Sequence, residues 1–185
     1  MIINNRKISS KIIGVISLVI GILSLIYYQG YTAYQLFSVL SLFIICFSSF
    51  VNTKLNLYFY TITYGGLAIV QINATLKTDI TTHMIITSFL IITAYILLVL
   101  YFWKINTASI ITSALLILVA LIRTQAFLNM LSMYFNYKIG NVNVYSKVML
   151  TGSIATLAYI FAPLMIAVLI LMNCVIPRDE IGRIK

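Results

Sequence analysis

The chain of 185 residues is 62% hydrophobic and only 8% charged, with twelve Lys and Arg against three Asp and Glu. Soluble domains usually carry about 25% charged residues, so this composition excludes a water-soluble globular fold. Lipid must therefore surround most side chains, and the sequence predicts a polytopic membrane protein. The basic residues are scattered singly or in pairs, so they do not form the basic face that a nucleic-acid site needs.

Six continuously apolar stretches follow one another along the chain. A hydrocarbon core about 30 Å thick requires roughly 20 apolar helical residues to cross it. Backbone groups in lipid must bond internally, and the stretches lack the alternating polarity of barrel strands, so we expect an all-α helical bundle. No linker or low-complexity tract divides the chain, so residues 1–185 should form a single transmembrane domain. The predicted spans are approximately 12–29, 34–51, 55–76, 84–103, 106–128 and 150–175.

The positive charges predict the orientation of these spans. With the N-terminus in the cytoplasm, the inner side holds eight of the twelve Lys and Arg residues and the outer side holds four. This asymmetry follows the positive-inside rule, and the Arg6–Lys7 pair before the first span weighs most. Six spans then place both ends of the chain in the cytoplasm. The first span is expected to be a retained anchor in the cell membrane, because no A-x-A-like cleavage site follows it.

Aromatic residues lie where a membrane interface predicts them. Tyr27, Tyr28, Tyr31 and Tyr34 fall at the outer boundary of the first two spans, and Trp103 falls at the inner end of the fourth. Such residues form an aromatic belt at headgroup level. The belt supports the predicted depths of the spans.

The connection over residues 129–147 differs from the others, which are short. It is predicted to lie outside, yet it is too apolar for an ordinary solvated loop. We expect it to extend the fifth helix and then lie in the membrane interface, or alternatively to cap an external cavity.

Small residues recur along the first span at spacings of 4, 3, 4 and 3. This spacing places them on one helical seam, and small residues allow helices to approach closely in lipid. The seam serves either to pack the first span within the bundle or to dock a partner subunit. It consists of Ser10, Gly14, Ser17, Gly21 and Ser24.

Polar residues of three consecutive spans fall at one depth, in the predicted outer third. Polar groups within spans are costly and are candidates for function. They predict an outward-facing polar pocket that contains an Asp79–Arg123 or a His83–Asp79 pair. Alternatively, Arg123 snorkels to the headgroups, Asp79 pairs with Lys77, and the amides join helices by hydrogen bonds. The candidate binding residues are Gln71, Asn73, Asp79, His83, Arg123 and Gln125.

The sequence lacks a catalytic constellation. Two of the three acids, Asp179 and Glu180, lie in the predicted cytoplasmic tail, which excludes paired-carboxylate and two-metal chemistry. Asp79 and His83 supply at most two metal ligands, and no third is evident. There is no G-x-S-x-G, H-E-x-x-H or phosphate-loop motif. We therefore expect no catalytic residue, no metal, no cofactor and no enzymatic activity.

The chain resembles two known families in limited respects. The run Tyr64–Val70 resembles the glycine-containing third helix of a small membrane subunit of respiratory complex I, over fewer than ten residues. Six short helices with a small-residue seam resemble, in architecture, substrate-binding components of energy-coupling-factor transporters. Neither likeness carries a ligand motif, and neither family is assigned.

The leading hypothesis is a non-enzymatic component of a larger membrane complex of transport or respiratory type, with the lipid bilayer and other membrane subunits as partners. The alternative is a small-solute binding or transport protein whose polar pocket takes a small-molecule ligand from the outer side. A third possibility, a lipid-modifying enzyme, requires residues that the sequence does not provide.

Overall fold

The computed structural model describes residues 2–27, 32–51, 54–77, 82–103, 105, 108–139 and 143–172. Over these residues the chain forms six α-helices and no strand, which confirms the expected all-α fold. The helices are α1 (Ile2–Ile26), α2 (Ala33–Phe50), α3 (Lys54–Lys77), α4 (Thr82–Phe102), α5 (Ser109–Ile139) and α6 (Asn143–Leu171).

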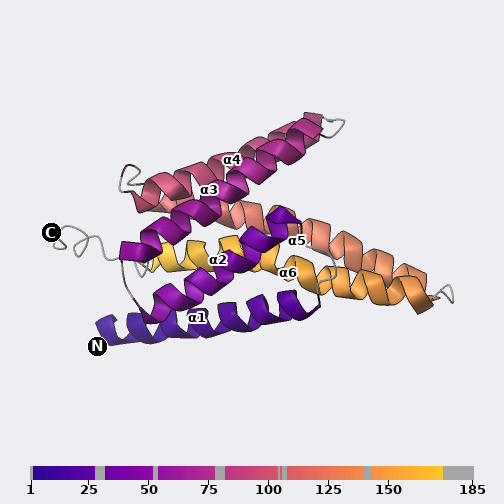
Figure 1. Cartoon of the computed structure of the whole chain (residues 1–185), viewed down its shortest axis with the longest axis horizontal. Helices are drawn as coiled ribbons and strands as arrows, with labels where there is room; N and C mark the ends of the chain where they lie inside the picture. Colours follow the sequence, from indigo (N-terminus) through magenta and orange to yellow (C-terminus); the bar gives the residue numbers. More distant parts are fainter. Residues whose placement is uncertain are drawn as a thin grey trace.

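Each helix packs against the next one along the chain, and α6 closes the bundle by contacting α1. In addition, α2 contacts α6, so these two helices lie at the centre of the arrangement. Figure 1 shows that α1 begins and α6 ends at the same end of the bundle. An even number of antiparallel helices brings the start of the first helix and the end of the last one to the same end of the bundle, as the sequence predicted.

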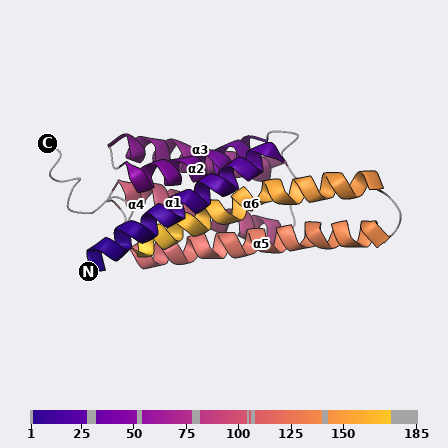
Figure 2. The same cartoon turned by 90° about the horizontal axis from the view of Figure 1, so that it is seen from below.

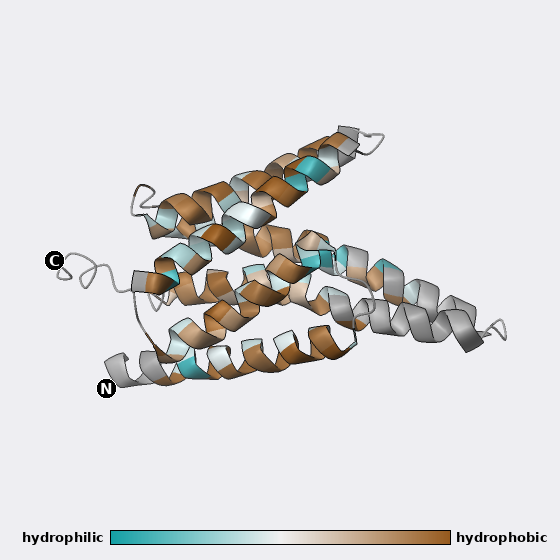
Figure 3. Ribbon diagram, viewed as in Figure 1, coloured by the Kyte–Doolittle hydropathy of each residue, from teal (hydrophilic) through white to brown (hydrophobic). Residues whose placement is uncertain are grey.

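The outer surface of the bundle is apolar. Four helices contain stretches long and apolar enough to cross a membrane, and α6 contributes a shorter apolar stretch. Large apolar side chains on this surface are highly exposed, such as Ile110 at 74% and Phe89 at 68%. Figure 3 shows hydrophobic residues over most of the ribbon that it colours. The protein is therefore a multi-pass membrane protein. The four stretches are Ile8–Ile26, Ala33–Phe50, Ile85–Phe102 and Ser109–Asn129.

Helix α3 is less apolar because it turns a polar face towards the interior. Its Asn56, Tyr60, Thr63 and Tyr64 are buried, whereas Ile62 on the opposite face is 64% exposed. The side-chain amide of Asn56 donates to the carbonyl of residue 51 at the end of α2, over 2.7 Å. Burial between neighbouring helices thus allows α3 to keep polar side chains that lipid would disfavour.

The small-residue seam of α1 is used within the chain. Gly14, Ser17, Gly21 and Ser24 are all buried. A Cβ atom added at Gly14 would lie only 2.7 Å from Cβ of Ser49 on α2. The seam therefore brings the backbones of α1 and α2 together, as one of the two interpretations requires. The four buried residues of the seam are covered by other parts of the bundle, so they offer no free surface to a partner subunit. Ser10, the fifth residue of the seam, is half-buried.

The last two helices are longer than the spans 106–128 and 150–175 predicted for them. The sequence predicted that residues after 128 extend the fifth helix, and α5 does continue to Ile139; the start of α6 at Asn143, before residue 150, was not predicted. The 31 residues of α5 correspond to about 46 Å at 1.5 Å per residue, well beyond a hydrocarbon core of about 30 Å. Figures 1 and 2 show α5 and α6 running side by side past the ends of the other helices. Residues 129–139 and 143–147 are therefore parts of these two helices rather than an interfacial helix or a separate cap.

Candidate functional site

Arg123 connects three helices through hydrogen bonds between side chains. It lies on α5, where its Nη2 donates to Oε1 of Gln71 on α3 over 3.0 Å. Nε2 of the same Gln71 donates to Oγ of Ser88 on α4 over 3.1 Å. The amide of Gln71 thus accepts from the cation and donates to the hydroxyl, which fixes its orientation between the two partners.

Two tyrosine rings from two further helices flank the guanidinium. Cζ of Arg123 lies 4.7 Å from the ring centre of Tyr34 on α2 and 6.0 Å from that of Tyr159 on α6. The two rings meet edge to face, with centres 5.0 Å apart. A cation over an aromatic face is attracted by the negative face of the ring. Side chains from three other helices, α2, α3 and α6, therefore contact the guanidinium of Arg123.

The position of Tyr34 is fixed by the start of α2. Thr32 caps this helix: its Oγ1 accepts from the backbone N–H of Gln35, and Gln35 Oε1 accepts from the backbone N–H of Thr32. This reciprocal arrangement is a capping box, which satisfies backbone donors that the first helical turn would otherwise leave unpaired. Tyr34 lies in that turn, and its hydroxyl is 2.9 Å from the hydroxyl of Tyr95 on α4. Tyr95 is only 1% exposed.

The charge of Arg123 is not balanced by any residue that the structure describes. All three acidic residues of the chain fall outside the described ranges, so the partners described for Arg123 are neutral. Its Nε is buried and has no hydrogen-bond acceptor among the described residues. A cation inside a membrane bundle normally pairs with an anion or marks a ligand pathway. The site has the chemistry to bind an oxyanion.

The structure brings together only part of the polar cluster predicted from the sequence. Gln71 and Arg123 are hydrogen-bonded to each other, whereas Asn73 and Gln125 are exposed. His83 belongs to α4, but its side chain, like the whole of Asp79, lies outside the described residues. Both predicted pairs, Asp79–Arg123 and His83–Asp79, therefore lie outside them as well.

The surroundings of Arg123 do not agree with the alternative interpretation, in which its side chain snorkels to the lipid headgroups. Its guanidinium is held between α2, α3 and α6, where it contacts Tyr34, Gln71 and Tyr159. A snorkelling arginine would instead extend along the helix surface to water. Arg123 faces the interior of the bundle.

Sequence reasoning missed the tyrosines of this site and the serine beside Gln71. The sequence placed Tyr34 in the aromatic belt, whereas the structure shows its side chain in contact with Tyr95 and Arg123. One available signal was the position of Tyr95 near the middle of the span 84–103, away from both ends where an aromatic belt would place it. The complete set, called the Arg123 cluster below, is Tyr34, Gln71, Ser88, Tyr95, Arg123 and Tyr159.

The cluster offers no ligand set for a metal ion. Among the described residues, no group of three or more His, Cys, Asp or Glu side chains comes together. Comparison with family models, with curated proteins and with solved structures gives no match. Function must therefore be argued from the Arg123 cluster and the bundle around it.

Proposed function

We propose that this membrane protein is non-enzymatic and binds and transports a small anionic solute, with Arg123 recognising the oxyanion. The observation that carries the proposal is a guanidinium that contacts three neutral side chains, those of Tyr34, Gln71 and Tyr159, with Nε lacking an acceptor among the described residues. A carboxylate or phosphate group on the solute would supply the missing negative charge. We propose no cofactor for this function.

The chemistry of the site favours an oxyanion over other ligands. The planar guanidinium fork matches the geometry of carboxylate and phosphate oxygens, and two oxygens can accept from it at once. Partial burial strengthens this attraction, because the surroundings of the charge are less polar than water. The rings of Tyr34 and Tyr159 restrict the fork to a few orientations, so less conformational entropy is lost on binding.

The depth of the site supports a role at the outer side of the cell membrane. Arg123 lies fourteen residues after the start of α5 at Ser109, which is about 21 Å along the helix axis. It therefore occupies the last third of the apolar stretch of α5, Ser109–Asn129. With the orientation that the basic residues favour, this third is the outer one, so the solute would enter from outside.

Oxyanion binding can be tested by the thermal unfolding of the purified protein. Acetate, inorganic phosphate and a series of larger mono- and dicarboxylates are added separately, with chloride at equal ionic strength to account for screening. We expect at least one oxyanion to raise the unfolding temperature in a saturable way. A ligand at one hundred times its Kd stabilises the folded state by about 2.7 kcal/mol.

Two variants make this test specific to the site. Arg123→Gln should abolish the oxyanion response, because it removes the charge and keeps a hydrogen-bonding side chain. Lys11→Gln is the matched control, since it removes one positive charge from an exposed position on α1 and should leave the response intact. A wild-type protein that responds to no oxyanion, or an Arg123→Gln variant that responds as the wild type does, would contradict the proposal.

A second function, that of a subunit in a membrane assembly, is favoured by the length of α5 and α6. With 31 and 29 residues, both helices exceed the roughly 20 residues that a bilayer crossing requires. Their outer parts run past the rest of the bundle, where a neighbouring subunit could pack against them (Figure 2). This proposal predicts co-purification of other membrane proteins in mild detergent. A monodisperse monomer that transports solute alone in liposomes would contradict it.

A further inference from the structure

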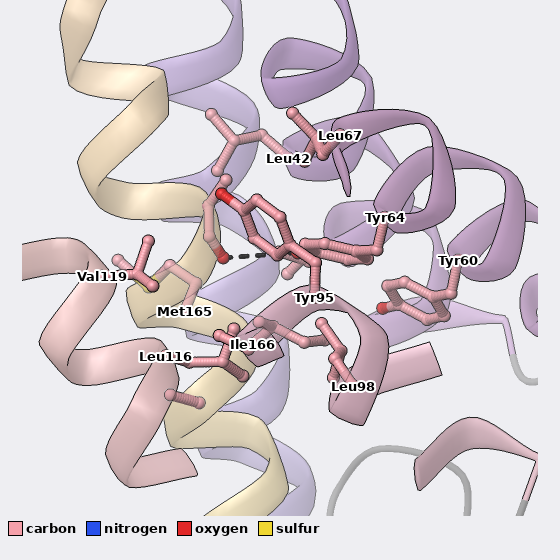
Figure 4. Close-up of a cluster of buried hydrophobic side chains, with 14 of the residues drawn as sticks. Leu42, Tyr60, Tyr64, Leu67, Tyr95, Leu98, Leu116, Val119, Met165 and Ile166 are labelled. Atoms are coloured by element: carbon pink, nitrogen blue, oxygen red, sulfur yellow. Dashed lines mark hydrogen bonds between the residues drawn. The ribbon is translucent and has the colours of Figure 1, made fainter. Parts of the chain in front are cut away.

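A column of buried aromatic rings continues from the Arg123 cluster into the bundle. Tyr95 on α4 lies 5.8 Å from Tyr64 on α3, measured between ring centres, and Phe102 on α4 stacks on Tyr60 of α3 at 4.6 Å. Tyr64 and Phe102 join the two pairs at 6.5 Å. Figure 4 shows Tyr60, Tyr64 and Tyr95 side by side in the interior. The column extends towards the end of the bundle where α3 begins.

Helix α2 presents a row of hydroxyl groups to this column. Tyr34, Ser38, Ser41 and Ser48 are spaced by four, three and seven residues, which places them on one face of the helix. Ser38 is 2% exposed and Ser41 is fully buried. Each serine hydroxyl donates to a carbonyl within α2 and keeps lone pairs that can accept a further hydrogen bond.

Hydroxyl groups of α2 pair with tyrosine hydroxyls of α3 and α4 at two levels. The surface made by these pairs is called the hydroxyl interface below. It begins at the Arg123 cluster and ends close to the last turn of α2. The pairs are Tyr34 with Tyr95 at 2.9 Å and Ser48 with Tyr60, and the buried Ser41 lies between them on the same face of α2. The hydroxyl of Tyr64 donates to the carbonyl of Ala162 on α6 over 3.5 Å.

The opposite face of α2 differs in this respect. It packs against α1, where Ser17 and Ser24 are as deeply buried as Ser41. The hydroxyls of Ser17 and Ser24, however, have no hydrogen-bond partner among the described residues. The hydroxyls compared at the two interfaces therefore differ: those of Ser17 and Ser24 lack a partner among the described residues, whereas those of Tyr34 and Ser48 pair with tyrosines of α4 and α3.

We propose that α2 and the α3–α4 pair separate along the hydroxyl interface, and that the anionic solute passes from Arg123 along it. The proposal rests on the proposed function of Arg123. Hydroxyl groups suit such a path because they can donate to an oxyanion in passing and can pair with each other when the path is closed. The structure shows the closed state, in which Tyr60, Tyr64 and Tyr95 are no more than 1% exposed.

The proposal can be tested by the reactivity of single cysteines in liposomes. The background carries Cys46→Ser and Cys174→Ser, and the reagent is a negatively charged methanethiosulfonate. Ser41→Cys reports on the hydroxyl interface, and Ser17→Cys is the matched control because both serines are 0% exposed. Ser38→Cys serves as a second reporter in case Ser41→Cys does not fold.

We expect Ser41→Cys to react at least about tenfold faster than Ser17→Cys, which corresponds to an opening that is about 1.4 kcal/mol easier. Adding Arg123→Gln should slow the charged reagent at Ser41→Cys and leave a neutral reagent of similar size unchanged. Equal rates at the two positions, or no reaction at either reporter, would overturn the path. That result would leave oxyanion binding at Arg123 standing, because binding is decided separately by the thermal shift.

Discussion

Replacement of Arg123 by methionine separates a binding role from a structural role. Methionine keeps a long unbranched side chain but has no charge. In Arg123→Met the hydrogen bond to Gln71 and the contact with the Tyr34 ring are lost. At the same time, the unfavourable burial of a cation is relieved. The sign of the change in stability depends on which contribution is larger.

The two contributions nearly cancel. A hydrogen bond to a charged group contributes about 1.5–3 kcal/mol and a cation–π contact about 0.5–2 kcal/mol. Placing an arginine within a membrane span is unfavourable by about 2.5–3.5 kcal/mol. At the midpoints of these ranges the variant loses only about 0.5 kcal/mol. We therefore expect Arg123→Met to keep the stability of the wild type within about 1 kcal/mol in the absence of oxyanions.

The measurement is reversible unfolding in mixed micelles, followed by the fluorescence of the single tryptophan. Trp103 suits this purpose because its indole Nε1 donates to Oγ1 of Thr61 over 2.9 Å, so its signal reports the pairing of α3 and α4. Far-UV circular dichroism measured on the same samples checks that the helices unfold together.

A large loss of stability would refute the reasoning. Removing one partner of a buried ion pair typically destabilises by about 3–5 kcal/mol. A value in this range for Arg123→Met would mean that a carboxylate of the chain already neutralises the guanidinium. Asp79→Asn and the double variant would then show, through a double-mutant cycle, whether Asp79 is that partner. A neutral effect of Asp79→Asn would exclude it.

Three further predictions concern stability and use the same unfolding measurement. Gly14→Ala should destabilise the protein by about 1–3 kcal/mol because the added Cβ meets α2. Gly65→Ala, with open space around it, should instead stabilise the protein by about 0.5–1 kcal/mol. Equal effects of the two substitutions would contradict the packing described. Ser24→Ala should stabilise by about 1 kcal/mol because it removes a buried hydroxyl without a partner, and a loss of stability would reveal a missing partner. Tyr95→Phe should destabilise by about 1 kcal/mol through the loss of its hydroxyl contact, and no change would mean that this contact contributes nothing.

The sequence predicted the helices best where their length is set by the bilayer. For α2 the predicted span 34–51 differs by one residue at each end from Ala33–Phe50. It failed where helices continue beyond the apolar core, as α1 does before residue 12 and α6 does before residue 150. Hydropathy indicates which residues can lie in the hydrocarbon core of the bilayer. A helix can continue beyond that core, because it ends only where its backbone hydrogen bonds end.

The depth of polar residues along the predicted spans located the site, but the sequence did not identify all of its residues. Counting along antiparallel helices placed Gln71 and Arg123 at one level, and the structure joins them. Depth does not tell which way a side chain points around a helix, nor which distant helices meet. The contacts with Tyr34 and Tyr159 depend on α2 and α6 lying at the centre of the bundle, a feature that comes from packing and is not encoded in any local pattern.

The polar face of α3 has a consequence for how the protein is made. Tyr60, Tyr64 and Asn56 find their partners on α2, α4 and α6, and the last two of these helices are synthesised after α3. A newly made α3 would therefore meet the bilayer before its polar face is fully covered. The preceding α2 already offers Ser48 and the carbonyl of Val51 to it, while α4 follows within a few residues and can enter together with it as a hairpin. The order of the helices along the chain thus supplies Asn56 and Tyr60 with a partner that is made before them, whereas the hydrogen bond of Tyr64 to Ala162 can form only when α6 has been made.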